Sequence, residues 1–152
     1  MADKTENIKT RLSFDGEAEY KAACKEINST LKVLNSEMKL VTAEYKDNAN
    51  SIEALKAKQE ILQKTYDEQA KKVEAAKKVL QEYQNAENQN VDAIQKAQKE
   101  LNYQRAALEN TNNALKENAR QQQEAERATS AAVLAQKQYE EACQGIDKNL
   151  SL

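Results

Sequence analysis

Apolar residues recur at alternating steps of four and three along most of this chain. This spacing averages 3.5 residues, which keeps one narrow stripe of a helix facing a partner helix in a left-handed coiled coil. The pattern therefore predicts an all-α fold of long coiled-coil helices. One unbroken register runs from residue 27 to residue 115, and we interpret it as a self-association seam. Its members are Ile27, Leu31, Leu34, Met38, Val41, Tyr45, Ile52, Leu55, Leu62, Tyr66, Val73, Leu80, Ile94, Leu101, Leu108 and Leu115.

The first residues follow a different pattern. Polar and apolar residues alternate from residue 7 to residue 14, which predicts a short N-terminal β-strand. An Asp-Gly pair at 15–16 predicts a turn, and a helix is expected from Glu17. One strand has no partner within this chain, so we expect it to contact a second copy or another protein. Its apolar contact residues would be Ile8, Leu12 and Phe14.

Two polar segments, 46–51 and 85–90, interrupt the helical pattern with residues that favour caps and turns. Asn50 followed by Glu53 resembles a capping box, so a helix could start there. Two models follow: three helices that fold back as a hairpin bundle, or one nearly continuous rod with two weak points. The heptad phase is kept through both segments, which favours the rod. In the rod Asn48 and Asn90 occupy core d positions and fix the register; otherwise they are loop residues.

Beyond Leu115 the core positions are mostly Ala, Gln or Asn, and this part should pack more weakly. The chain thus divides into a strand and turn at 1–16, a heptad coiled coil at 17–115, and a weaker Ala/Gln-rich helical extension at 116–152. Gly145 is a reasonable helix stop. Bulky core tyrosines favour a trimer, although tyrosines at the edge of the seam would suit any oligomer number.

Composition and charge narrow the function. Of 152 residues 32% are charged and 5% aromatic, and the net charge is -2. No basic stripe is seen, so we expect no nucleic-acid site. No apolar run reaches the length of a membrane span, and the first residues do not resemble a signal peptide. Cys24 and Cys143 lie far apart, which favours reduced thiols in a cytosolic protein over an interchain disulfide.

Candidate chemistry is sparse. The chain has no histidine, and its two glycines form no phosphate-binding loop. Acidic pairs such as Glu140-Glu141 fall on helix faces beside lysines. Carboxylates that are exposed to solvent and have no pocket around them are not activated for catalysis. We therefore expect no enzymatic activity, no cofactor and no metal.

The N-terminal residues resemble the opening of phage tail tape measure proteins, most closely those of phages and prophages of Gram-positive bacteria. The resemblance covers about residues 8 to 80. It is carried by Leu12-Ser13-Phe14-Asp15-Gly16-Glu17, Tyr20-Lys21, Lys25-Glu26-Ile27-Asn28, Leu31-Lys32-Val33-Leu34, Ser36-Glu37-Met38-Lys39-Leu40-Val41, Ala43-Glu44-Tyr45, Asn48, Ser51 and Leu55-Lys56-Ala57-Lys58.

The resemblance implies a homo-oligomeric helical rod in the lumen of the virion tail that scaffolds tube assembly and sets tail length. Its partners would be tail tube, tail tip or assembly-chaperone proteins, the last in the bacterial cytoplasm during assembly. A continuous helix of 152 residues spans only about 230 Å, and tape measure proteins are usually longer. We therefore expect an N-terminal piece of such a protein, or a short relative. The alternative is a helical-hairpin coiled-coil adaptor or chaperone-like binding module, with true turns at 47–51 and 85–90.

Overall fold

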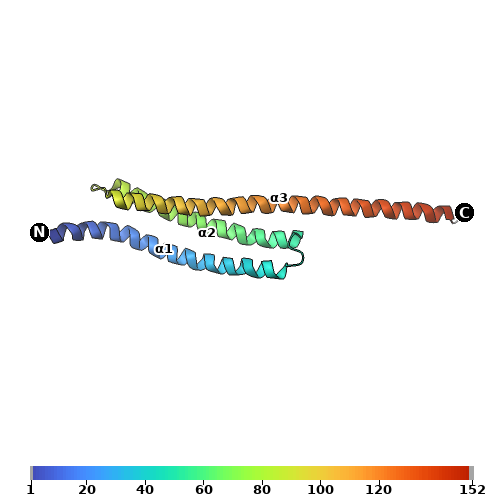
Figure 1. Cartoon of the computed structure of the whole chain (residues 1–152), viewed down its shortest axis with the longest axis horizontal. Helices are drawn as coiled ribbons and strands as arrows, with labels where there is room; N and C mark the ends of the chain where they lie inside the picture. The colour runs from blue at the N-terminus through green and yellow to red at the C-terminus, as the bar shows by residue number, and fades with distance from the viewer. Residues whose placement is uncertain (1, 151–152) are drawn as a thin grey trace.

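The chain forms three long helices. The computed structural model describes the backbone of residues 2–150 and the side chains of residues 17–150. Helix α1 comprises Ala2–Glu44, α2 Ile52–Asn85 and α3 Val91–Leu150. The chain reverses direction at both breaks, so α2 runs antiparallel to α1 and α3 and packs against each of them (Figure 1). The predicted all-α class is confirmed for the described residues.

Side chains cap the two helices that follow the breaks. The Ser51 hydroxyl accepts a hydrogen bond from the Ala54 amide at 3.2 Å, and the Asn90 side-chain oxygen accepts one from the Ala93 amide at 3.2 Å. Such bonds satisfy amides that a helix N-terminus leaves without a partner. The cap predicted at Asn50 therefore lies one residue too early. Asn48 and Asn90 are exposed in these turns, so their loop interpretation is the correct one.

The chain folds back at both polar segments, and the continuous-rod model is wrong for the described residues. Preserved heptad phase favoured the rod, but each helix of a hairpin also aligns its own apolar stripe with a neighbour. Phase alone therefore does not distinguish the two models. The polar segments decide the outcome because their Asn, Asp and Ser side chains compete for backbone hydrogen bonds and supply caps.

The predicted β-strand at residues 8–14 and the turn at 15–16 are also wrong. The backbone of these residues belongs to α1, which begins at Ala2. A helix pairs its own backbone groups, whereas a single strand needs a second strand to pair with. The side chains of the predicted partner-contact residues lie outside the described part of the chain. These residues are Ile8, Leu12 and Phe14.

Helix α2 carries two apolar stripes because it lies between α1 and α3. Its a and d residues join those of α3 in one buried cluster, formed by Val73, Ala76, Leu80, Ala97 and Leu101. A second stripe, at heptad positions c and g, consists of Ala54, Ile61, Ala75 and Val79. Ala75 and Val79 line a small cavity together with Tyr20 of α1, which places this second stripe toward α1.

Helix α3 extends well beyond α2. Gln122 of α3 contacts Gln59, close to the start of α2. From residue 126 to residue 150 every side chain except that of Cys143 is exposed. This part of α3, which we call the arm, projects alone at the C-terminal end of the molecule (Figure 1). Gly145 does not end the helix, because a glycine costs a helix interior only about 1 kcal/mol relative to alanine.

Candidate functional site

The predicted seam lies between the three helices of one chain. All of its residues are buried or half-buried. The buried ones are Ile27, Leu34, Leu55, Val73, Leu80 and Leu101. Sequence reasoning therefore identified residues that pack helix against helix. Their use for self-association stays a prediction, since the contacts seen here are made within the chain.

Polar residues at core positions of α2 and α3 bond to one another across the interface. The Thr111 hydroxyl donates to the Gln69 side-chain oxygen at 2.6 Å. The Gln122 amide donates across the interface to the side-chain oxygen of Gln59 at 2.5 Å and, within α3, to that of Asn118 at 2.6 Å. No buried polar side-chain atom among the described residues is left without a hydrogen-bond partner. These layers therefore avoid the penalty for burying an unpaired polar group.

Asn118 occupies the most buried of these polar positions. Its side chain is held at 5% exposure, and its amide donates to the backbone oxygen of Leu55 at 3.0 Å. A buried polar residue at a core position tolerates only the register in which its partner is opposite. The pairs between α2 and α3 therefore fix how these two helices are aligned. The sequence marked Asn118 as a weak core position, but its partner is visible only in the fold.

A tyrosine joins the first and third helices. The Tyr20 hydroxyl of α1 donates to the Glu100 carboxylate of α3 at 2.9 Å. Burial, together with hydrogen bonds to Cys24 and Glu100, raises the pKa of Tyr20 far above its usual value. The Tyr83 hydroxyl donates to the Glu17 carboxylate at 2.9 Å, and burial followed by this bond raises the pKa of Tyr83 to about 12. Both hydroxyls therefore stay protonated at neutral pH and link neighbouring helices.

A groove of about 540 Å³ opens beside this junction. It is lined mainly by α1, with one residue each from α2 and α3, and four of its lining residues are lysines: Lys21, Lys25, Lys32 and Lys72. The Lys72 ammonium donates to the Asn28 side-chain oxygen at 2.9 Å. The groove also exposes Cys24, which like Cys143 is a free, half-buried cysteine. The groove is polar and open, and its positive charge is its main chemical feature.

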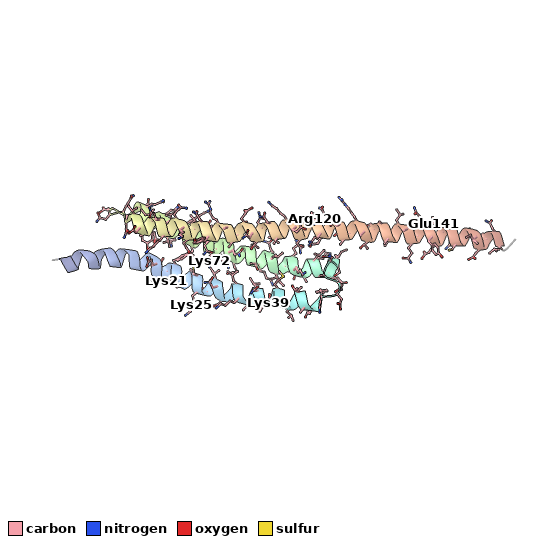
Figure 2. The ribbon with its side chains drawn as sticks, viewed as in Figure 1. Lys21, Lys25, Lys39, Lys72, Arg120 and Glu141 are labelled. Atoms are coloured by element: carbon pink, nitrogen blue, oxygen red, sulfur yellow. The ribbon has the colours of Figure 1, made fainter. Side chains whose placement is uncertain are left out.

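Two lysines of this groove, Lys25 and Lys32, belong to a longer row. Lys25, Lys32 and Lys39 of α1 and Lys46 of the turn after it recur every seven residues and are all exposed; Figure 2 labels Lys25 and Lys39. We call these four the lysine row. The sequence analysis missed it because the charges were judged by their mixture along the chain. A seven-residue period in lysine alone was the signal that could have found it.

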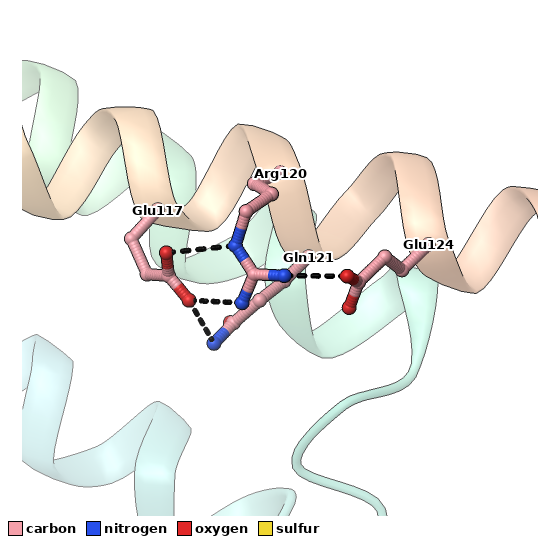
Figure 3. Close-up of polar contacts among 4 residues, drawn as sticks. All are labelled: Glu117, Arg120, Gln121 and Glu124. Atoms are coloured by element: carbon pink, nitrogen blue, oxygen red, sulfur yellow. Dashed lines mark hydrogen bonds and ion pairs between the residues drawn. The ribbon is translucent and has the colours of Figure 1, made fainter.

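The arm begins just after a ladder of ion pairs on α3. The Arg120 guanidinium bonds to Glu117 and Glu124, at 2.5 Å in each case, and the Gln121 amide also donates to Glu117 (Figure 3). The hydrogen bond and charge of Arg120 lower the pKa of Glu117, and the same bond raises that of Arg120. Ion pairs at spacings of three and four support a helix locally. They lie where α3 loses the support of α2.

The arm carries five large apolar side chains that are mostly exposed. They are Val133, Leu134, Tyr139, Ile146 and Leu150.

The described residues contain no group of three or more potential metal ligands. None of the described helices is both long and apolar enough to cross a membrane. Comparison of the chain with protein-family models, with curated proteins and with solved structures found no significant match.

Proposed function

We propose that this protein is a structural, non-enzymatic component that acts through helix-to-helix contacts. The observation that carries this proposal is the distribution of apolar residues. Those of the heptad seam are covered within the chain, while the arm presents further apolar residues with no helix beside them. Exposed apolar groups of this kind are typical of interaction sites. The arm is therefore the part that is available for a partner.

Within this class, we propose the role of a phage tail tape measure protein, as its N-terminal part. The support is the sequence resemblance, which spans most of α1 and α2 from about residue 8 to residue 80. In this role the chain would lie in the tail lumen, contact tube, tip or chaperone proteins, and scaffold tube assembly. The folded form has a bearing on length: α3, the longest helix, has 60 residues and spans only about 90 Å.

A tape measure protein is encoded in a phage or prophage genome, so the test of this role is to change the length of the chain in that genome. Insertion of 28 or 56 residues of heptad sequence after Ala125 lengthens a helix by about 42 or 84 Å. Tails should lengthen in proportion to the insertion, as measured by electron microscopy. A matched control replaces residues 126–139 with a heptad sequence of the same length and should leave tail length unchanged. Tails of constant length in both insertion variants would refute the tape-measure role.

A second candidate is a helical-hairpin adaptor or chaperone-like module. The observation that favours it is the pair of capped turns at residues 45–51 and 86–90, which make a folded-back bundle. In an adaptor, the hairpin holds the arm in place and the arm binds the client. This function predicts that the insertions leave tail length unchanged, whereas removal of residues 126–150 abolishes client binding. The insertion experiment therefore separates the two candidates.

A further inference from the structure

We infer that the arm of one copy of this chain binds the exposed face of α1 on a second copy, in a parallel, head-to-tail arrangement. This inference concerns a surface outside the heptad seam, and it does not depend on the phage-tail role. It rests on three features of the described residues: the charge of α1, the charge and apolar residues of the arm, and the common direction of α1 and α3.

The lysines of the row have no acid at the spacings that form ion pairs within a helix. At positions three and four residues away on either side, none of Lys25, Lys32, Lys39 and Lys46 has an aspartate or glutamate. Helix α2 differs, because its acids are followed by lysines at these spacings, as in the 3.2 Å ion pair of Glu74 with Lys77. A row of like charges that its own helix does not balance attracts a negatively charged partner.

Two apolar side chains border the lysine row. Val33 follows Lys32 directly and is 56% exposed, and Leu40 follows Lys39 and is 59% exposed. The two lie seven residues apart and therefore on one side of α1. This face therefore has one pair of apolar residues with lysines on one flank. The positions one heptad before and after the pair are Glu26 and Asp47.

The arm carries the complementary pattern. Tyr139 is 71% exposed and is followed by Glu140, and Ile146 is 58% exposed and is followed by Asp147. The apolar pair again has a spacing of seven residues, but here the residue that follows each apolar residue is acidic. Lys137 lies three residues before Glu140, on the same helix.

The arm has 25 residues and spans about 37 Å, while the part of the lysine row that lies on α1, from Lys25 to Lys39, spans about 21 Å. The arm is therefore long enough to cover this part of the row, and the two surfaces agree in period.

The relative direction of α1 and the arm follows from the positions of the charged residues beside their apolar residues. On α1 each lysine precedes its apolar residue, whereas on the arm each acid follows it. In a pair of parallel helices the residue before a core position on one helix lies on the same side as the residue after a core position on the other. Parallel pairing therefore brings Lys32 and Lys39 to the flank that carries Glu140. Antiparallel pairing would place these charges on opposite sides.

The fold is consistent with this direction. Helices α1 and α3 run the same way, since both are antiparallel to α2 (Figure 1). A copy displaced both along and across the long axis of the molecule can therefore place its α1 beside the arm of the copy before it, with the two helices parallel. Such a heterologous contact does not close on itself, so repeated association forms an open chain of molecules.

Pairing of two arms is less favourable. In antiparallel pairing Glu140 would face acidic residues of the same flank on the other arm. In parallel pairing it would face the small neutral residues Ala135 and Ala142. Helix α2 also has lysines every seven residues, at Lys64, Lys71 and Lys78. However, Lys71 pairs with Glu68 and Lys78 with Glu19. The lysines of the row have no such acidic partners on their own helix, so we place the arm on α1.

The first test measures molar mass by light scattering as a function of concentration, with the full chain. We expect the average mass to rise continuously above that of one chain, and to fall again when salt screens the charges. Glu140→Lys should weaken association about fivefold, because it replaces an attraction by a repulsion. Its control, Glu141→Lys, makes the same charge change one residue further round the helix, and should leave association unchanged.

A mixing experiment tests the head-to-tail geometry. One variant carries Tyr139→Ser and Ile146→Ser in the arm, and the other carries Val33→Ser and Leu40→Ser in α1. These residues are exposed, so circular dichroism should show unchanged helix content in both. Each variant alone should be monomeric, whereas their mixture should form a species of two chains and nothing larger, because only one intact arm and one intact α1 face meet.

Three outcomes would overturn the inference. The first is a wild-type chain that stays monomeric up to about 0.5 mM, a range in which a dissociation constant of hundreds of micromolar is measurable. The second is equal weakening by Glu140→Lys and Glu141→Lys. The third is a mixture of the two serine variants that remains monomeric.

Discussion

Leu55 offers the most direct test of how the chain folds back. It is the largest fully buried side chain among the described residues, with 2% of its surface exposed. It lies in the first turn of α2, opposite the part of α3 that precedes the arm, where its backbone oxygen accepts the hydrogen bond of Asn118. In the hairpin this position is a closed contact between α2 and α3.

The expected cost of Leu55→Ala follows from this burial. The substitution removes three buried carbon groups, each worth about 0.8 kcal/mol on transfer from water, or about 2.4 kcal/mol together. A residual cavity adds to this sum, and measured values for buried leucines lie at about 2–5 kcal/mol. We expect a loss of about 3 kcal/mol in the free energy of unfolding. The backbone hydrogen bond to Asn118 is unaffected, because the substitution changes only the side chain.

Urea denaturation followed by circular dichroism measures this loss. The matched control is Leu134→Ala, the same substitution on the arm, where the side chain is 56% exposed. The control should change stability by less than about 0.5 kcal/mol, since it removes no buried contact and alanine favours helix. At low protein concentration the midpoint should not depend on concentration, because the contact forms within one chain. A loss below about 1 kcal/mol for Leu55→Ala, or equal losses for the two leucines, would refute the packing described here.

Three further predictions test other parts of the fold. Thr111→Val should cost about 1 kcal/mol because it leaves Gln69 without its 2.6 Å partner, and adding Gln69→Leu should restore part of the loss, as a double-mutant cycle in urea would show. The pKa of Tyr83 is raised from 10.0 to about 12 in the folded state, so the stability it provides is complete below pH 10 and is lost as the pH rises toward 12. The melting temperature should fall less steeply over this range in Tyr83→Phe than in wild type; identical slopes would contradict the prediction. A nonspecific protease should cut first at 45–51 and 86–90, and mass spectrometry of the fragments would identify cuts within helices instead if the chain were a continuous rod.

The sequence pattern was sufficient to find one of the two packing stripes of the fold. A run of apolar residues at heptad spacing has one physical use, the burial of a narrow stripe against another helix, and every predicted seam residue is at least half-buried. The pattern does not indicate which helix covers the stripe. It gives the same signal for a neighbour in the same chain and for a second copy, which is why the rod and the hairpin both agreed with it.

Other features depended on contacts that a linear pattern does not contain. The second stripe of α2, with Ala54 and Ile61, became visible only once α2 was known to lie between two helices. Asn118 was predicted as a weak core position, although its buried amide bonds to Leu55. The alternation at residues 8–14 predicted a strand because periodicity over so short a segment is ambiguous, and helix formation there follows from the continuous good helix formers that come after it.

The short connections explain why the seam is used within the chain and why the arm differs. Residues 45–51 join α1 to α2, and residues 86–90 join α2 to α3. Short linkers hold two helices at an effective concentration in the millimolar range. A second chain can therefore displace the helices that already cover the seam only if its concentration exceeds the millimolar range or if it binds the seam much more tightly. The arm has no such neighbour among the described residues, because α2 begins only at Ile52 and the side chains of α3 past residue 125 are exposed except for that of Cys143. A partner for the arm competes with solvent alone, so association at ordinary concentrations should proceed through the arm and leave the seam intact.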